Sequence, residues 1–358
     1  MTDTEKKKNI LKDVLSGADS GSFDGEKDLL DIIYQGERQQ MKSAPEKIRE
    51  APEPTYKLIP EIWAIGGGKG GAGKSVVSTI LAFWLARMGK RTVLIDVDLG
   101  GANIHTLMGI KSPPRSINDF ITRKFKSLED ICIDTEEKNL RLISGSSEVL
   151  SFANAHFSQK IKLINHFSRL DADNLVLDLG AGTSFNVLDF FLAADEKIVV
   201  LTPEPTSIQN AYIFVRNAVY RRLSRLSSKD PSLKALVKIA MDPKNELKIR
   251  TIKELLQFIQ ESGGKDVAEP LEKEIGEIRP AVITNMVKDS KEKNAGRIVQ
   301  IVAERYLMTK SIALGSVSYD KQIFRMISDM LPLIQIDQSS QAFSNIYEII
   351  TNLLKHRA

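Results

Sequence analysis

The sequence predicts an α/β protein with a doubly wound, mainly parallel sheet flanked by helices, and three observations support this fold class. From residue 59 onward, short apolar stretches alternate with helical patterns, as repeated βαβ units require. Several of these stretches are almost continuously apolar, as at 92–95 and 198–201, which is typical of strands buried on both faces. A glycine-rich loop follows the first stretch, and ligands of such sheets bind beyond the carboxyl ends of the strands.

The first 58 residues differ from the rest of the chain in composition. They combine a lysine run at 6–8 with small polar residues and several prolines, which favours a flexible N-terminal extension with short helices. Two short amphipathic stretches stand out, at 10–15 and 29–34. The alternative interpretation is that one of them docks on a partner, with the apolar side chains of 29–34 as anchors.

Residues 59–358 are predicted to form one P-loop domain with a basic helical insertion at about 220–280. Strands are expected at 61–66, 91–97, 139–144, 174–179, 197–202, 281–287 and 311–317. Helices are expected at 76–88, 208–228, 232–241, 250–262, 267–276 and 344–354. The apolar stripe of the last helix is more typical of a core helix than of a membrane anchor.

The loop at 66–75 carries the strongest functional signal. Gly68 to Ser75 fit the pattern G-x-x-x-x-G-K-[ST], placed between a strand and a helix. Backbone N–H groups of such a loop converge on an anion, and the helix N-terminus adds partial positive charge. Lys74 is therefore expected to reach the β- and γ-phosphates of a nucleotide, and the Ser75 hydroxyl to bind Mg²⁺.

Acidic residues follow two of the predicted strands. Asp96 and Asp98 end the second strand, and Asp178 ends a later one. Because the carboxyl ends of parallel strands meet at the same edge of a sheet, these carboxylates are expected beside the glycine loop. There they can hold Mg²⁺ directly or through water.

Composition and charge restrict the other function classes. The net charge is only +4, so the whole chain gives no argument for nucleic acid. Residues 213–253, however, contain eleven Lys or Arg against three Asp or Glu. We favour slightly the interpretation that these charges lie on a helical face and pair within the fold; the alternative is a binding site for DNA or anionic lipid.

The single Cys132 excludes an internal disulfide, and the four histidines lack metal-ligand spacing. No signal peptide or long apolar run is present, which predicts a cytoplasmic protein.

The loop resembles that of a particular family. Residues 69–75 match the deviant Walker A motif K-G-G-x-G-K-[ST] of the MinD/ParA ATPases. The likeness continues through 96–98, 178–182, 202–207 and 284–287, and within the family it is closest to the FlhG (FleN, YlxH) branch. One departure is Asn210, which stands where relatives often have aspartate.

The resemblance implies roles for individual residues. Lys69 is the signature lysine, which in relatives reaches the partner's phosphates across an ATP-sandwiched homodimer. With Lys74 and with Asp98, which would orient the attacking water, it forms the implied catalytic set. The implied Mg²⁺ site comprises Ser75, Asp96 and Asp178. The implied ATP site, in which Asn285 recognises adenine, comprises Gly68, Gly70, Gly71, Ala72, Gly73, Lys74, Ser75, Val76, Pro203, Glu204 and Asn285.

Three functions follow as expectations. The leading one is a Mg²⁺-dependent ATPase switch, homodimeric in the ATP state, that binds an unidentified protein partner and controls the position or number of flagella or a similar cell-envelope machine. Peripheral contact with the inner face of the membrane stays open in this case. The alternative is a ParA-like partitioning ATPase that binds DNA non-specifically in the ATP state. A metallocofactor-maturation ATPase is disfavoured, because such proteins often carry cysteine pairs and Cys132 stands alone.

Overall fold

An eight-stranded sheet runs through the domain in the order β3-β4-β2-β5-β1-β6-β7-β8. The structure is a computed structural model that describes residues 59–98, 101–145, 157–242, 244–337 and 339–355. The N-terminal residues, with both predicted amphipathic stretches, lie outside this part of the chain. The strands are β1 (Glu61–Gly66), β2 (Thr92–Asp96), β3 (Ile133–Asp134), β4 (Leu140–Ile143), β5 (Asn174–Asp178), β6 (Glu196–Leu201), β7 (Pro280–Val287) and β8 (Ile312–Ser318).

All strand pairs are parallel except the pair of β3 with β4. The seven predicted strands and the parallel sheet are confirmed. The edge strand β3 was not predicted, because two residues are too few to show the alternation of apolar and polar side chains that identifies a strand. β1 lies between β5 and β6, so the loop that follows it sits near the middle of the carboxyl edge of the sheet.

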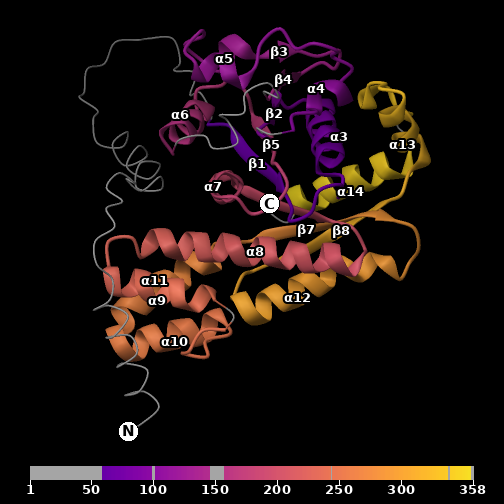
Figure 1. The fold of residues 1–358 in the computed structure, drawn as a ribbon. Helices are drawn as coiled ribbons and strands as arrows, with labels where there is room; N and C mark the ends of the chain where they lie inside the picture. Colours follow the sequence, from indigo (N-terminus) through magenta and orange to yellow (C-terminus); the bar gives the residue numbers. More distant parts are fainter. Residues whose placement is uncertain (1–58, 99–100, 146–156, 243, 338, 356–358) are drawn as a thin grey trace, which may run out of the picture.

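Helices cover both faces of this sheet (Figure 1). Contacts with the strands place α3 and α14 on one face, and α7, α8 and α12 on the other. The helices are α3 (Lys74–Arg87), α4 (Ile104–Leu107), α5 (Ile117–Ile121), α6 (Phe157–Phe167), α7 (Phe185–Ala193), α8 (Pro205–Leu226), α9 (Pro231–Met241), α10 (Ile252–Gly263), α11 (Lys265–Gly276), α12 (Ala295–Leu307), α13 (Lys321–Ser328) and α14 (Gln341–Lys355), with single turns of 3₁₀-helix at η1 (Glu129–Ile131), η2 (Glu292–Asn294) and η3 (Leu333–Gln335).

The central strands are buried on both faces, as their nearly continuous apolar sequence requires. Along β1, Trp63 and Ile65 join the core on the side of α3 and α14, whereas Ala64 joins the core on the side of α7 and α8. The same alternation continues in β6, where Ile198 and Val199 point to opposite faces. Successive side chains of a strand point to opposite faces, so one apolar run supplies both cores.

The predicted insertion forms α9, α10 and α11, which pack against α8 and α12 (Figure 1). Local signals explain its boundaries. Asp230 caps α9 and Pro231 occupies the first turn, while Thr251 and Glu254 form a capping box at α10. Gly264, with φ of 91°, separates α10 from α11. The four helical patterns predicted between 208 and 276 are thus confirmed to within a few residues.

The C-terminal helix α14 belongs to the core. Ile346, Ile349, Ile350 and Leu353 are buried in the layer that α14 shares with α3. The prediction that this apolar stripe serves the core rather than a membrane is therefore confirmed for the residues described. None of the helices in the described ranges is long and apolar enough to cross a membrane.

Candidate functional site: a phosphate loop beside three carboxylates

The glycine loop leaves β1 and ends at Gly73, which has φ of 83° and caps the start of α3 in the left-handed conformation. Gly68 fits only because it has no side chain: a Cβ atom there would lie 2.2 Å from the backbone oxygen of Asn210 in α8. The first turns of α8 therefore press directly on the phosphate loop. The residue that departs from the family pattern, Asn210, contributes backbone to this contact.

Asn285 links the phosphate loop to the end of β7. Its side-chain Nδ2 donates a hydrogen bond of 2.9 Å to the backbone oxygen of Ala72, and the side chain is buried. The next residue, Met286, has a positive φ of 60° and packs near Gly73. The structure thus brings Asn285 to the predicted site through contact with the loop itself, and recognition of adenine stays a prediction.

Lys74 lies in the buried floor of the loop, with 8% of its surface exposed. Burial lowers the pKa of Lys74, and the negative charges of Asp178 and Asp98 oppose that shift. A buried ammonium group needs compensating charge. Lys74 is therefore placed among the carboxylates that the sequence predicted, and their negative charges compensate its buried ammonium group.

Asp178 ends β5 directly beside β1, and its carboxylate is buried. The hydroxyl of Ser78, in the second turn of α3, donates to Asp178 Oδ1 at 2.8 Å. Burial raises the pKa of Asp178 to about 6, although hydrogen bonds from Ser75 and Ser78 and the charge of Lys74 hold it down. The predicted metal pair of Ser75 and Asp178 is therefore in contact. Ser78 was missed, although a serine one turn after the lysine-serine pair was a usable signal.

Asp96 is next to Asp178 in the register of β2 and β5. Its carboxylate accepts hydrogen bonds from the backbone N–H groups of Asp98, Asn103 and Ile104, at 3.1, 3.0 and 3.1 Å. Burial and the charge of Asp178 raise the pKa of Asp96 to about 7. Asp96 thus organises the turn that carries Asp98, which is a positioning contact the sequence did not predict.

Asp98 projects from this turn and is partly exposed. A Cβ atom at Gly180 would lie 2.9 Å from Asp98 Oδ1, so the carboxylate lies against the loop that follows Asp178. The structure therefore brings together Lys74, Asp96, Asp98 and Asp178 at one edge of the sheet.

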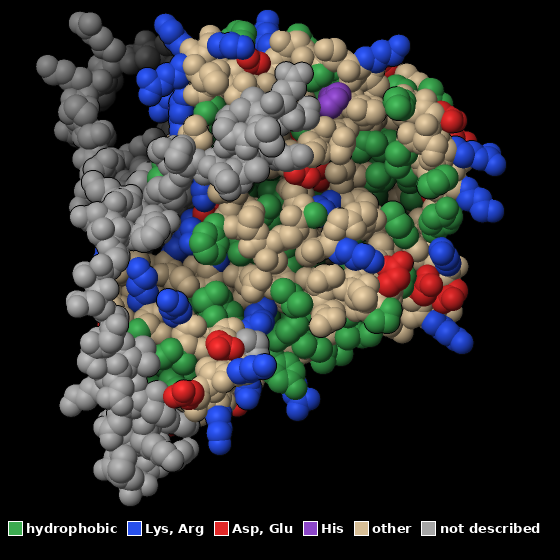
Figure 2. All heavy atoms as spheres, in the orientation of Figure 1, with side chains coloured by type: hydrophobic (Ala, Val, Ile, Leu, Met, Phe, Trp, Pro, Cys, Tyr) green, Lys and Arg blue, Asp and Glu red, His purple; other side chains and the backbone are tan. Residues whose placement is uncertain are grey.

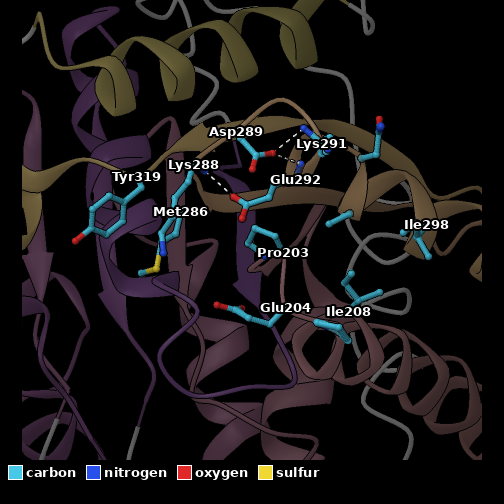
Figure 3. A pocket seen from close by; sticks show the side chains of 13 residues that line it. Pro203, Glu204, Ile208, Met286, Lys288, Asp289, Lys291, Glu292, Ile298 and Tyr319 are labelled. Carbon is cyan, nitrogen blue, oxygen red and sulfur yellow. Dashed lines mark hydrogen bonds between the residues drawn. The ribbon is translucent and has the colours of Figure 1, made fainter.

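A cavity of about 500 Å³ opens between the start of α8 and the segment after β7 (Figure 3). Glu204 and Pro203 border it, as do Met286 and Tyr319. A hydrogen bond from the Thr202 hydroxyl lowers the pKa of Glu204, with smaller contributions from the charges of Lys69 and Lys288. Its other lining residues are Pro205, Ile208, Lys288, Asp289, Lys291, Glu292, Asn294, Ala295 and Ile298.

The arginines of the basic block are largely structural. Asp189 of α7 has no exposed surface and pairs with Arg221 at 2.8 Å, Arg225 at 2.7 Å and Lys160 at 2.5 Å. Burial alone would raise the pKa of Asp189, but these three cations lower it. Arg222 pairs with Glu274 of α11. The interpretation that these charges pair within the fold is confirmed for Arg221, Arg222 and Arg225. The sequence signal for it was Asp189, a single acidic residue within the apolar sequence of α7.

No cluster of three or more His, Cys, Asp or Glu side chains able to hold a metal ion occurs among the described residues. Cys132 is half-buried, and burial raises the pKa of its thiol to about 12. Its thiolate is therefore scarce at neutral pH, as expected for a packing residue.

The residues present fit Mg²⁺ and a nucleoside triphosphate. The loop offers backbone N–H groups at a helix N-terminus, Lys74 offers one buried positive charge, and the Ser75 hydroxyl lies beside the Asp178 carboxylate. Oxygen donors of this kind suit Mg²⁺, which is commonly held by one or two protein groups and by substrate phosphates.

Part of the chain is similar to known proteins. A family model described as ParA, "NUBPL iron-transfer P-loop NTPase", matches residues 59–218. The antiactivator FleN of Pseudomonas aeruginosa is 37% identical over 158 residues, which are 44% of this chain and 55% of FleN. The flagellum site-determining protein YlxH of Helicobacter pylori is 32% identical over 155 residues, 43% of this chain and 52% of YlxH. The chain thus spans about half the length of these relatives.

A solved structure agrees with the fold. The septum site-determining protein MinD from Pyrococcus horikoshii OT3, in complex with Mg-ADP, superposes with a TM-score of 0.56. The match covers 84% of this chain and 98% of that protein, at 17% sequence identity. Identity at this level supports the shared architecture and nothing finer.

Proposed function

Because this chain belongs to the MinD/ParA family of P-loop NTPases, we propose that it is an ATPase switch in which ATP drives dimerisation and slow hydrolysis reverses it. The observation that carries this proposal is the group formed by Lys74, Ser75, Asp98 and Asp178 at the end of the phosphate loop. It combines a buried cation, a hydroxyl group and carboxylates at the N-terminus of α3, as binding of Mg-ATP requires.

Lys74 would bind the β- and γ-phosphates, while Ser75 and Asp178 would hold Mg²⁺ and its water ligands. Mg²⁺ supplies charge neutralisation on the phosphates when it is bound. Asp96 keeps the turn of Asp98 in place through its three backbone hydrogen bonds. Asp98 would then accept a hydrogen bond from the attacking water and orient it toward the γ-phosphate.

Lys69 supports the dimer part of the proposal. It lies at the outer part of the loop beside Gly70 and Gly71, which are exposed, and its charge acts on Glu204. From this position it would reach the phosphates bound by a second copy. One chain alone would thus lack the lysine of its partner that stabilises the charge on its phosphates, so hydrolysis would require dimerisation.

The biological role proposed is control of the position or number of flagella or of a related cell-envelope machine, through an unidentified protein partner in the cytoplasm. Two relatives support this role: FleN is an antiactivator, and YlxH is a flagellum site-determining protein. The cavity beside Pro203 and Glu204 borders the start of α8, and Met286, which lines it, also packs near Gly73 of the phosphate loop. Nucleotide binding there would alter the surface that a partner meets.

The test is the oligomeric state of the chain with ADP, ATP or no nucleotide, measured by light scattering alongside phosphate release. We expect the wild type to be a dimer with Mg-ATP and a monomer with ADP or without nucleotide. Asp98→Ala should stay dimeric in ATP while hydrolysis falls about 100-fold or more. Lys69→Ala should still bind ATP, and Lys74→Ala should not. A wild-type chain that binds ATP and stays monomeric would refute the dimer, and one that binds no ATP would refute the whole proposal.

One observation favours a second candidate, ATP-dependent retention on DNA. With the three buried arginines set aside, seven cationic side chains of residues 213–253 are exposed: Lys229, Lys234, Lys238, Lys244, Lys248, Arg250 and Lys253. If they bind phosphate backbones, Lys234→Glu with Lys238→Glu should weaken retention and reduce its salt dependence. Lys273→Glu in α11 is the control. Reversal of Arg221 or Arg222 would be a poor test, because it would disrupt buried pairs.

A further inference from the structure

One buried hydroxyl group, that of Ser78, lies between α3 and the end of β5. Ser78 has no exposed surface. Its Oγ lies 2.8 Å from Asp178 Oδ1 and 3.0 Å from the backbone oxygen of Lys74. A serine hydroxyl has a single proton, so it donates to one of these acceptors at a time. The choice between them decides whether Ser78 serves the carboxylate or only the helix.

The carboxylate is the stronger of the two acceptors. Hydrogen bonds to an ionised group are about twice as strong as those between neutral groups. The carbonyl of Lys74 already has a donor, because a carbonyl in an α-helix accepts the backbone N–H of the residue four positions later, which in α3 is Ser78 itself. The hydroxyl therefore favours Asp178.

A second hydroxyl of the same helix also meets this carboxylate. Ser75 and Ser78 are three residues apart in α3 and so lie on the same face of the helix. The helix packs against β5, whose last residue is Asp178, and the Ser75 hydroxyl hydrogen-bonds to Asp178 as well. Two hydroxyls of one helix face thus hold one carboxylate, and of the two only Ser75 is a predicted metal ligand.

Solvent has little access to this contact. Figure 2 shows Lys, Arg, Asp and Glu side chains spread over the outside of the domain, where water surrounds them. Asp178, by contrast, is 2% exposed. The terminal torsion of an aspartate is broad, so the carboxylate turns readily when a donor is missing. A buried acid that loses its donor also loses a hydrogen bond that bulk water does not restore.

The neighbouring acid is held in a different way. Asp96 lies beside Asp178 in the sheet and accepts hydrogen bonds from three backbone N–H groups. Those donors are fixed by the course of the chain and do not depend on a side chain. The orientation of Asp178 depends instead on hydroxyl groups, which a single substitution can remove.

We propose that Ser78 is a positioning residue of the candidate site: its hydroxyl fixes the Asp178 carboxylate in the orientation in which it meets Ser75 and the Mg²⁺ ion with its water ligands. This role rests on the proposed Mg-ATPase function. Groups that hydrogen-bond to the ligands of a metal orient them, and their loss commonly weakens metal binding by about 10- to 100-fold. Ser78 would thus tune the affinity for Mg²⁺ through Asp178 rather than by contact with the metal.

The test is binding of a fluorescent ADP analogue to the full chain, titrated with Mg²⁺ and repeated in EDTA. Ser78→Ala should raise the Mg²⁺ concentration that gives half-maximal binding about tenfold or more, and the ratio of the affinities with Mg²⁺ and with EDTA should fall accordingly. Damage to the fold would weaken both affinities alike and leave their ratio unchanged. Ser78→Thr, which keeps the hydroxyl, should restore the ratio.

Thr79 is the matched control. It also has no exposed surface, and its hydroxyl donates to the backbone oxygen of Ser75 at 2.8 Å. This is the same bond to the preceding turn that Ser78 can make to Lys74. Thr79→Val removes the hydroxyl and keeps the shape of the side chain, so a role in holding the helix would appear in both variants. We expect Thr79→Val to require the same Mg²⁺ concentration as the wild type.

The outcomes separate this role from the proposed function. If the added methyl group of Ser78→Thr prevents folding, Ser78→Cys replaces it, because a thiol is a weak donor, and this variant should lie between Ser78→Ala and the wild type. The proposal is overturned if the wild type binds the analogue with Mg²⁺ and Ser78→Ala needs no more Mg²⁺, or if Thr79→Val shows the same change. A wild-type chain that binds no nucleotide with Mg²⁺ would refute the ATPase itself, and this role with it.

Discussion

Single residues at the site show that burying several ionisable groups together carries an electrostatic cost, which Mg-nucleotide would relieve. Lys74, Asp96 and Asp178 are ionisable and buried within one small region. Burial raises the pKa values of both acids and lowers the pKa of the lysine, so the charged form of each group is disfavoured there. Such groups are common where proteins bind ions or perform catalysis.

The first prediction concerns pH. In the unfolded chain Asp178 ionises at its ordinary pKa of 3.8, whereas in the folded chain it ionises at about 6. The folded state binds more protons between these values, so this contribution to stability is complete below about pH 4 and is lost as the pH rises through 6. Denaturation of the nucleotide-free chain at pH 4 to 8 should show this decline.

Asp178→Asn should flatten the decline, because the variant has no carboxylate to ionise at this position. It should also lower the pKa of Asp96, since the charge of Asp178 is one cause of its elevation. Mg-ATP should reduce the pH dependence of the wild type by favouring the ionised form. A variant whose stability still falls with pH as steeply as the wild type would contradict this account.

At the scale of elements, the phosphate loop and α8 form one packed unit. Gly68 lies against the backbone of Asn210, and a Cβ atom at Gly66 would lie 2.7 Å from the ring of Phe214, one turn further along α8. Loop conformation and helix position are therefore not independent.

Two neighbouring glycines test this contact. Gly68→Ala should destabilise the nucleotide-free chain by about 1–3 kcal/mol, because the new methyl group forces α8 and the loop apart. Gly70→Ala should change stability by less than about 0.5 kcal/mol, since no atom lies within 4 Å of a Cβ atom built there. Urea denaturation compares them. Equal effects of the two substitutions would show that the loop yields without moving α8.

The Asp189 group is the second element-scale feature, and it ties α7 and α6 to α8. Asp189→Ala should cost about 3–5 kcal/mol, because three buried cations lose their shared carboxylate. The matched control is Glu277→Ala, which removes an ion pair whose side chains, Glu277 and Arg279, are 59% and 60% exposed. That loss should be less than about 0.5 kcal/mol. Similar losses in both variants would mean that Asp189 contributes no more than a surface charge.

At the scale of the whole molecule, α14 closes the core and its apolar stripe is not available to a membrane. Ile350 is fully buried, whereas Asn352 is exposed. Ile350→Asp should lower stability by about 3 kcal/mol or more, because it buries an unpaired charge, and Asn352→Asp should be nearly neutral. Thermal unfolding measures both. A tolerated Ile350→Asp would show that α14 detaches from the domain.

Patterns that repeat along the chain were predictable, and contacts between distant residues were not. The strand β1 and the lysine-serine pair after it can be recognised from neighbours in the sequence, because the period of the apolar residues and the glycine spacing are local. The hydrogen bond from Asn285 to Ala72 joins residues 213 positions apart. Arg221 looked like a surface cation for the same reason, since only the fold reveals its pairing with Asp189.

The length of α8 has a mechanical consequence. Its 22 residues make a rod about 33 Å long. One end rests on the phosphate loop, and the other carries Arg222, whose bond to Glu274 fastens α11. A tilt of about 3° at the loop would move the far end by about 2 Å, by the geometry of a rigid rod of this rise per residue. If nucleotide binding tilts α8 in this way, the predicted insertion would move with its far end, and a fluorophore on α9 would report the bound state.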